Sequence, residues 1–148
     1  SLREIFHRQY CWHYRFARLD AEAMHRAAQP LLGKHDFRSF QSSGSPRDTT
    51  VRTIFDIAVQ RTGQWPQTME PLAGQGRAAA GDWLIVEVEG DGFLYNMVRV
   101  LVGTLVQVGR GARAEHWPGE VLRAADRRSA GPTAPPQGLF LLHVDYDS

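Results

Sequence analysis

Residues 92–111 read GFLYNMVRVLVGTLVQVGRG, the most apolar stretch of the chain. Its core, 93–108, is too long for a single buried strand, so we interpret it as a helix. On a helix, the polar residues and the glycine fall on one stripe: Asn96, Arg99, Gly103 and Gln107. Apolar residues fill the remaining faces, which is typical of a helix buried in a core. Gly103 would allow another backbone to approach closely.

Arg99 is the residue of this stretch that most needs an explanation. Burying a guanidinium without a partner costs several kcal/mol, so an arginine inside an apolar helix needs a carboxylate, a phosphate or a cavity wall. The alternative is an arginine whose charged end reaches the helix edge and meets solvent. The spacing alone leaves both interpretations open.

Two further helices are indicated outside this stretch. Asp20 is a good N-cap for a helix that runs to Leu32 and stops at Gly33, and Pro30 should kink or shorten it. A helix over 118–128 would begin with Pro118 near its first position.

Strand signals and loop signals alternate along the rest of the chain. Strands are predicted at 51–61, 82–90 and 139–146, of which 82–90 alternates most regularly. Irregular connections are predicted at 34–50, 62–81 and 130–138. We expect one α+β domain over 19–148, with a largely antiparallel sheet and helices on one face, preceded by an aromatic and basic segment at 1–18.

Composition limits the possible functions. The 148 residues are 43% hydrophobic and 22% charged, with a net charge of +1, which is typical of a soluble globular protein. The near-neutral charge excludes a basic tail that coats nucleic acid, although it permits a local basic face. Sixteen of the seventeen cations are arginine, the residue that binds phosphate bidentately, but a GC-rich genome would give the same bias. Cys11 alone excludes an intrachain disulfide, and we expect a cytoplasmic protein.

The familiar catalytic patterns are weak here. His35 and Asp36 could form a general base pair, but adjacent loop residues more often tie the loop together. The histidines lack metal-ligand spacing, and Ser42 lacks the context of a nucleophile elbow. Aromatic residues and arginines interleave over 6–16, which suits RNA stacking as well as packing on a neighbour.

Four blocks in order carry a resemblance to a known family. They are GKHDF with Phe40 (33–40), RTI (52–54), GFLYNMVR through VGRG (92–111) and APPQGL (134–139) before a strand that ends VDY. Together they closely resemble the C-terminal half of the tRNA pseudouridine synthase A family, over roughly residues 10–146. That resemblance implies isomerisation of uridine to pseudouridine in the anticodon stem-loop of tRNA, without cofactor or metal, by an enzyme that is usually a homodimer.

The resemblance also assigns roles to residues. Arg99 would pair with the catalytic aspartate, and the substrate-binding residues would be Phe93, Met97, Gly138 and Leu139, although core packing is the alternative for Met97. Contacts with RNA phosphates would come from Arg38, Arg47, Arg52 and Arg110.

The family's aspartate lies in an Arg-Thr-Asp motif that this sequence lacks, since residues 47–49 read Arg-Asp-Thr. We therefore expect a fragment that is inactive alone, in which Arg99 faces an open cleft and its charge can be removed without loss of stability. The alternative is a non-catalytic RNA-binding or dimerisation module with the same fold.

Overall fold

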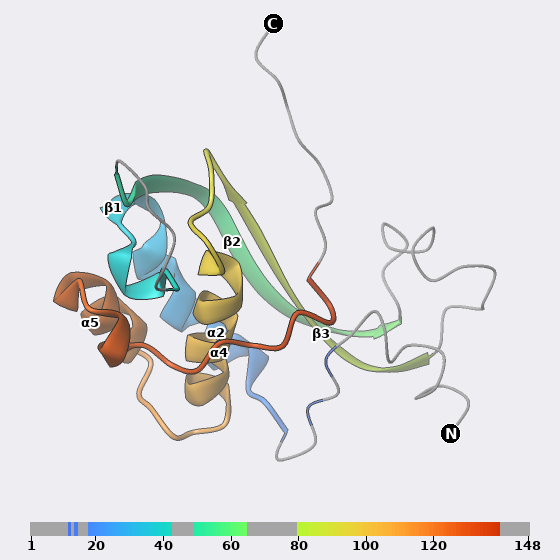
Figure 1. Ribbon diagram of the computed structural model, residues 1–148. Helices are drawn as coiled ribbons and strands as arrows, with labels where there is room; N and C mark the ends of the chain where they lie inside the picture. Colours follow the sequence, from blue (N-terminus) through green and yellow to red (C-terminus); the bar gives the residue numbers. More distant parts are fainter. Residues whose placement is uncertain (1–11, 13, 15–17, 43–48, 65–79, 140–148) are drawn as a thin grey trace, which may run out of the picture.

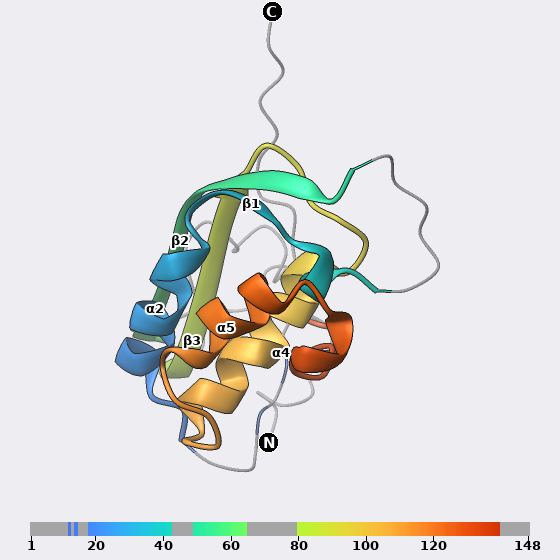
Figure 2. The same cartoon turned by 90° about the vertical axis from the view of Figure 1, so that its left-hand side faces the viewer.

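The computed structural model describes residues 12, 14, 18–42, 49–64 and 80–139 (Figure 1). Three antiparallel strands form a sheet in the order β1-β2-β3: β1 Gly33–Asp36, β2 Val51–Gln64 and β3 Ala80–Gly90. The α-helices are α2 Ala21–Ala28, α4 Met97–Gly109 and α5 Trp117–Ala124, and the short 3-10 helices are η1 Gln29–Leu31, η2 Arg38–Phe40 and η4 Arg127–Ser129. The helices pack against the sheet, so the expected α+β class is confirmed (Figure 2).

A bulge in β2 decides which of its side chains face the helices. Ile54 pairs with Gly90, but the next partners are Asp56 and Glu89, so Phe55 is an extra residue on β2. Strict alternation, as the sequence predicted it, places Ile54 and Ile57 on opposite faces. The bulge brings both into the core, where they are 2% and 1% exposed, and leaves Phe55 60% exposed.

Helix α2 covers the edge of β2 beyond the end of β1. Asp20 caps the helix as predicted, because its carboxylate accepts from the Ala23 amide at 3.0 Å. Past Ile54, no strand of the described residues pairs with β2 on this side, and side chains of α2 and η1 hydrogen-bond to its backbone. The Val59 amide donates to His25 Nδ1 at 3.1 Å, and Gln29 Nε2 donates to the Ile57 carbonyl at 3.3 Å.

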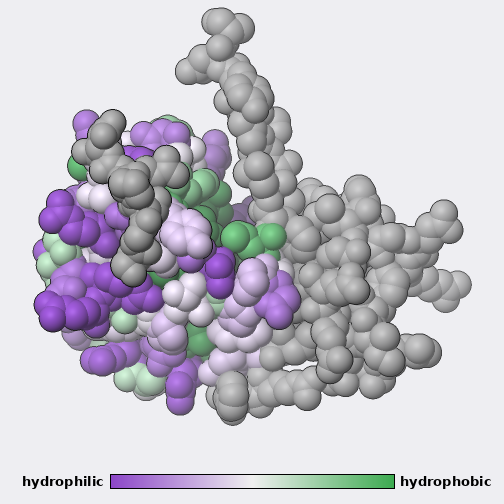
Figure 3. Space-filling view, in the orientation of Figure 1, coloured by the Kyte–Doolittle hydropathy of each residue, from purple (hydrophilic) through white to green (hydrophobic). Residues whose placement is uncertain are grey.

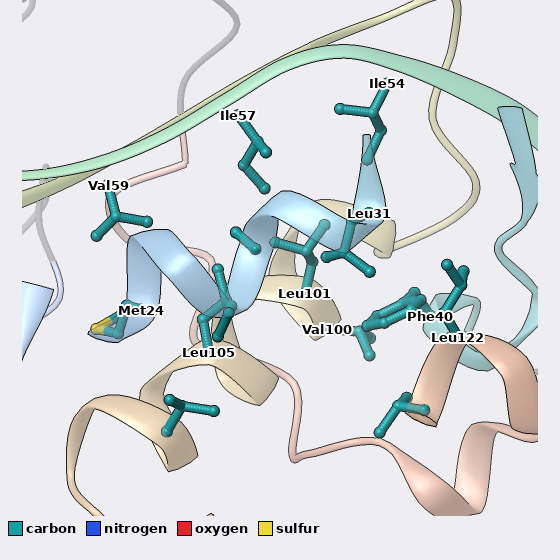
Figure 4. Packing of buried hydrophobic residues seen from close by; sticks show 14 of the residues in the cluster. Met24, Leu31, Phe40, Ile54, Ile57, Val59, Val100, Leu101, Leu105 and Leu122 are labelled. Atoms are coloured by element: carbon teal, nitrogen blue, oxygen red, sulfur yellow. The ribbon is translucent and has the colours of Figure 1, made fainter. Parts of the chain in front are cut away.

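Helix α4 lies between the core and the chain segment 131–134. Figure 4 shows Leu101 and Leu105 of α4 in one core with Ile54, Ile57 and Leu31. On another side of α4 the backbone of 131–134 passes so close that a Cβ at Gly103 would lie 1.7 Å from the Pro132 carbonyl oxygen. The buried Thr104 hydroxyl accepts from the Gly131 amide at 3.0 Å. The close approach that Gly103 predicted is therefore confirmed.

Several predicted boundaries were wrong. Part of the predicted loop 34–50 is ordered secondary structure, because β1 pairs with the first residues of β2 and η2 is fixed by Ser39, whose hydroxyl donates to the Val121 carbonyl at 2.6 Å. Helix α4 begins at Met97 rather than 93, since Asn96 has a left-handed backbone (φ 58°). Helix α2 ends at Ala28, where η1 with Pro30 takes over, so the predicted shortening is confirmed.

One more predicted boundary differs from the structure, and two predicted segments lie almost wholly outside the described residues. Helix α5 ends at Ala124, where Ala125 adopts a left-handed backbone, rather than at 128. The predicted strand 139–146 and the segment 1–18 lie almost wholly outside the described residues.

Among the described helices, none is both long enough and apolar enough to cross a membrane.

The Gly103 contact gives a direct stability test. Gly103→Ala should destabilise the chain by about 2–3 kcal/mol, because the added methyl group displaces the 131–134 backbone rather than a flexible side chain. Gly119→Ala in α5 is the matched control, since its Cβ would meet nothing closer than the Arg123 side chain at 3.4 Å. That change should be neutral or stabilising by up to about 1 kcal/mol. Urea unfolding of both variants checks this, and equal effects would contradict the contact.

Candidate active site

Arg99 sits in the first turn of α4, partly buried, with its guanidinium held by two neighbours. Its Nε donates to the Ala134 carbonyl at 2.8 Å, and its Nη1 donates to Asn96 Oδ1 at 3.0 Å. The Arg99 carbonyl also accepts from the Ala134 amide at 3.0 Å. Backbone and side chain of Arg99 are thus both tied to the segment that packs on Gly103.

Neither acceptor of the guanidinium is charged. Within the described parts of the chain, no carboxylate forms an ion pair with Arg99, and its Nη2 nitrogen has no hydrogen-bond partner. A guanidinium can donate five hydrogen bonds and stays protonated. Arg99 is therefore an oriented cation whose charge is not neutralised by any carboxylate of the described residues.

Apolar side chains are exposed on both sides of this residue in the sequence. Tyr95 is 53% exposed and Leu139 49% exposed. Gly138, with φ 99°, precedes Leu139 at a left-handed position that suits glycine. Phe93 is half-buried against the core, while Met97 is 1% exposed and belongs to the core cluster. The described structure thus gives Met97 the packing role that the sequence had left as its alternative.

The space-filling view shows how polarity is distributed on the face that carries α4, α5 and 130–139. Hydrophilic residues gather over α5, and small hydrophobic areas lie nearer the middle of the molecule, beside the grey atoms (Figure 3). A polar surface therefore borders a more apolar one on this face.

The structure describes three of the four arginines predicted to contact phosphate. Arg110 follows the C-terminal end of α4, eleven residues and roughly 16 Å along the helix from Arg99. Arg52 Nη1 donates to the Thr49 and Val51 carbonyls, and Arg38 lies 3.6 Å from the Asp36 carboxylate. Arg47 lies outside the described residues.

A further arginine reaches the segment that holds Arg99. Arg127 in η4 donates from Nη2 to the Thr133 hydroxyl at 3.2 Å. Its neighbour Arg128 forms an ion pair with Asp126. Hydrogen bonds from the Arg128 guanidinium and backbone amide hold the pKa of the Asp126 carboxyl below its usual range. Arg127 was not singled out in the sequence because it looked like one of several cations that end a helix.

His35 and Asp36 tie the loop together, as the alternative interpretation predicted. His35 Nε2 lies 2.6 Å from the Leu32 carbonyl oxygen. Asp36 Oδ1 accepts from the Thr50 hydroxyl at 2.6 Å and from the Arg38 amide at 3.0 Å. These contacts fix β1 and η2, and no general base pair is formed.

Comparison with known proteins places the helix that carries Arg99 in a known family. The family model for tRNA pseudouridine synthase matches residues 27–147, which is most of the chain and includes α4 and the 131–139 segment. The chain belongs to the tRNA pseudouridine synthase family.

Curated relatives of the family agree with this match. The tRNA pseudouridine synthase A of Thermoanaerobacter sp. (strain X514) is 40% identical over 139 residues, which cover 94% of this chain and 49% of the relative. Those of Syntrophotalea carbinolica and Myxococcus xanthus are 42% and 45% identical over 93% and 88% of this chain, and 47% and 43% of their own lengths. The chain thus spans about half the length of these relatives.

The tRNA pseudouridine synthase match does not by itself reveal the hydrogen-bond partners of Arg99. Sequence reasoning missed the roles of Asn96, Ser42 and the Ala134 carbonyl. Asn96 and Arg99 lie three residues apart on the predicted polar stripe, and that spacing was the available signal. Contacts between Arg99 and Ala134, 35 residues away, had no such signal.

The two hydrogen bonds of Arg99 change the expectation for its removal. Arg99→Met keeps the apolar stem but leaves the Ala134 carbonyl and Asn96 Oδ1 without their donor, so this chain should lose about 1–2 kcal/mol of stability instead of none. Arg123→Met, on the exposed surface of α5, is the matched control and should change stability by less than about 0.5 kcal/mol. Thermal unfolding measures both, and an unchanged Arg99→Met midpoint would refute the described contacts.

Proposed function

We propose that this chain is the C-terminal, tRNA-binding half of a synthase that isomerises uridine to pseudouridine in the anticodon stem-loop, and that the catalytic aspartate comes from a segment outside it. The observation that carries the proposal is Arg99, held by two uncharged acceptors and lacking a carboxylate among the described residues. Membership of the synthase family, with a chain about half as long as its curated relatives, supports a missing partner for this cation.

In the assembled site, Arg99 would keep the incoming aspartate ionised and aimed. A carboxylate beside a guanidinium has a lowered pKa, so it stays a nucleophile near neutral pH. Because the guanidinium is already fixed at Nε and Nη1, little reorganisation is needed when the charge pair forms. The carboxylate would attack C1′ of the flipped nucleoside and displace the uracil as its N1 anion, and the uracil would turn in place. Its C5 would then bond to C1′ as the carboxylate leaves, the C5 proton would be lost to water, and N1 would take up a proton.

The exposed apolar residues would hold the base during this turn. Leu139, half-exposed after the left-handed Gly138, would pack on the uracil, and Phe93 would line the same pocket. Met97 would support helix α4 from the core and would not touch the base, since its side chain is buried. Core burial of Met97 removes it from the contact surface that the sequence suggested.

Arginines farther from Arg99 would contact the tRNA backbone. Arg110, exposed at the far end of α4, is spaced to meet a phosphate well away from the reacting uridine. Arg38, Arg47 and Arg52 are retained as further candidates. The assembled enzyme would be a homodimer acting in the cytoplasm without cofactor or metal.

If the nucleophile comes from the other half, this chain alone and a chimera of both halves should differ in activity. This chain alone should release no tritium from [5-³H]uridine in tRNA, because it lacks the nucleophile. A chimera that joins the N-terminal half of the Myxococcus xanthus relative to this chain should release it, with the intact relative as the positive control. Turnover by this chain alone would contradict the proposal.

Within the chimera, Arg99 should matter through its charge and its fork geometry. Arg99→Lys should lower kcat by at least about a hundredfold, because the ammonium cannot keep both the Ala134 contact and the carboxylate. Arg123→Met should leave kcat within about twofold. A chimera that binds tRNA and folds but shows equal rates for the parent and Arg99→Lys would favour the non-catalytic RNA-binding module instead.

A further inference from the structure

Asn96 has an unusual backbone for a residue at the start of a helix. Its φ of 58° and ψ of 13° are left-handed, and its side chain makes no capping bond to α4. Asparagine tolerates this conformation better than most residues, but glycine adopts it without steric cost. A polar side chain kept at such a position, and not used to cap the helix, indicates another use for that side chain.

That use is visible in the hydrogen bonds of Asn96. Its Oδ1 accepts from Arg99 Nη1 at 3.0 Å, and its Nδ2 donates to the Ser42 hydroxyl at 3.2 Å. The orientation of the amide follows from chemistry, because an arginine only donates and the oxygen of Asn96 must therefore face it. The amide is engaged at both ends, so it cannot turn without losing a partner.

Ser42 provides a fixed anchor for this amide. The Ser42 backbone amide donates to the Tyr95 carbonyl at 3.1 Å, which joins the stretch after η2 to the one before α4. The hydroxyl and the amide of Ser42 thus hold two consecutive residues, Tyr95 and Asn96. A continuous line of hydrogen bonds runs from Ser42 through Asn96 to the guanidinium.

We infer that Asn96 is a positioning residue that orients the Arg99 guanidinium toward its incoming carboxylate, with Ser42 as its anchor. With Nε on Ala134 and one Nη1 donor on Asn96, the guanidinium cannot rotate. Its Nη2 has no partner among the described residues, and this nitrogen fixes the direction from which an anion approaches. Since Nε is occupied, a carboxylate binds through the Nη nitrogens rather than through the Nε edge. This role in catalysis rests on the proposed function, whereas the orientation itself is a property of this chain.

The experiment therefore has one arm on this chain and one on the chimera. Asn96→Gly keeps a residue that is at ease with positive φ and deletes only the amide, so folding is preserved. In ¹⁵N spectra of this chain, the Arg99 Nε–H of Asn96→Gly should exchange with water about tenfold faster than in the parent, while the backbone amide signals remain those of a folded chain. Ser42→Ala, which leaves the amide but removes its anchor, should give a smaller acceleration in the same direction.

A conservative variant separates positioning from structure. Asn96→Asp retains the Oδ acceptor and the tolerance of positive φ, so the Arg99 exchange rate should return to within about twofold of the parent. In the chimera, Asn96→Gly should lower kcat about tenfold with KM within twofold, the loss of one hydrogen bond to a charged group. Asn96→Asp should not restore kcat, because its own charge competes with the catalytic carboxylate for Arg99.

Distinct results overturn the two ideas. Unchanged Arg99 exchange in both Asn96→Gly and Ser42→Ala would overturn the positioning role, whatever the chimera does. Faster exchange combined with an unchanged kcat in an active chimera would overturn its catalytic part. An inactive parent chimera that binds tRNA would count against the proposed function alone, and the exchange data would still decide whether Asn96 orients Arg99.

Discussion

The contact of one backbone with another at Gly103 is the constraint on which the candidate site depends. Residues 131–134 pass so close to α4 that no side chain fits at Gly103, and a Cβ at Gly131 would lie 2.9 Å from the Gly103 carbonyl oxygen and from Thr104 Cα. This approach places the Ala134 carbonyl within 2.8 Å of Arg99 Nε. The guanidinium is therefore oriented by a long-range backbone contact as well as by Asn96, at the start of the helix that carries it.

The charge of Arg99 has no counter-ion among the described residues. Two uncharged acceptors hold the guanidinium in place but do not neutralise it. In an enzyme, such preorganisation places the cost of orientation in folding rather than in the reaction. The chain belongs to the synthase family and spans about half the length of its curated relatives, and under the proposed function the counter-charge comes from a part of the enzyme that this chain does not cover.

Elements with local signals could be predicted from the sequence. The α4 helix follows from the length and period of its apolar stretch, and the cap at Asp20 from the residue type. Features set by distant contacts could not be. The bulge at Phe55 depends on pairing with β3, β1 depends on pairing with β2, and η2 depends on Ser39 reaching Val121.

The same division holds for the site. Arg99 could be identified because a charge in an apolar helix is costly, and the family resemblance gave it a role. The role of Asn96 could not be predicted, because it arises from a left-handed φ and from Ser42, which lies 54 residues away. The contact of Arg127 could not be predicted either, because in the sequence Arg127 resembles other cations at the end of a helix. The packing of 131–134 brings Thr133 within hydrogen-bond distance of it.

The most direct test is a crystal structure of this chain joined to, or complexed with, the N-terminal half of a relative. The expected result is an aspartate carboxylate of that half at about 2.8 Å from Arg99 Nη2, with the Ala134 and Asn96 hydrogen bonds retained. A structure in which Arg99 pairs with a carboxylate of its own chain, or in which no carboxylate of the other half comes within about 4 Å of Nη2, would contradict it.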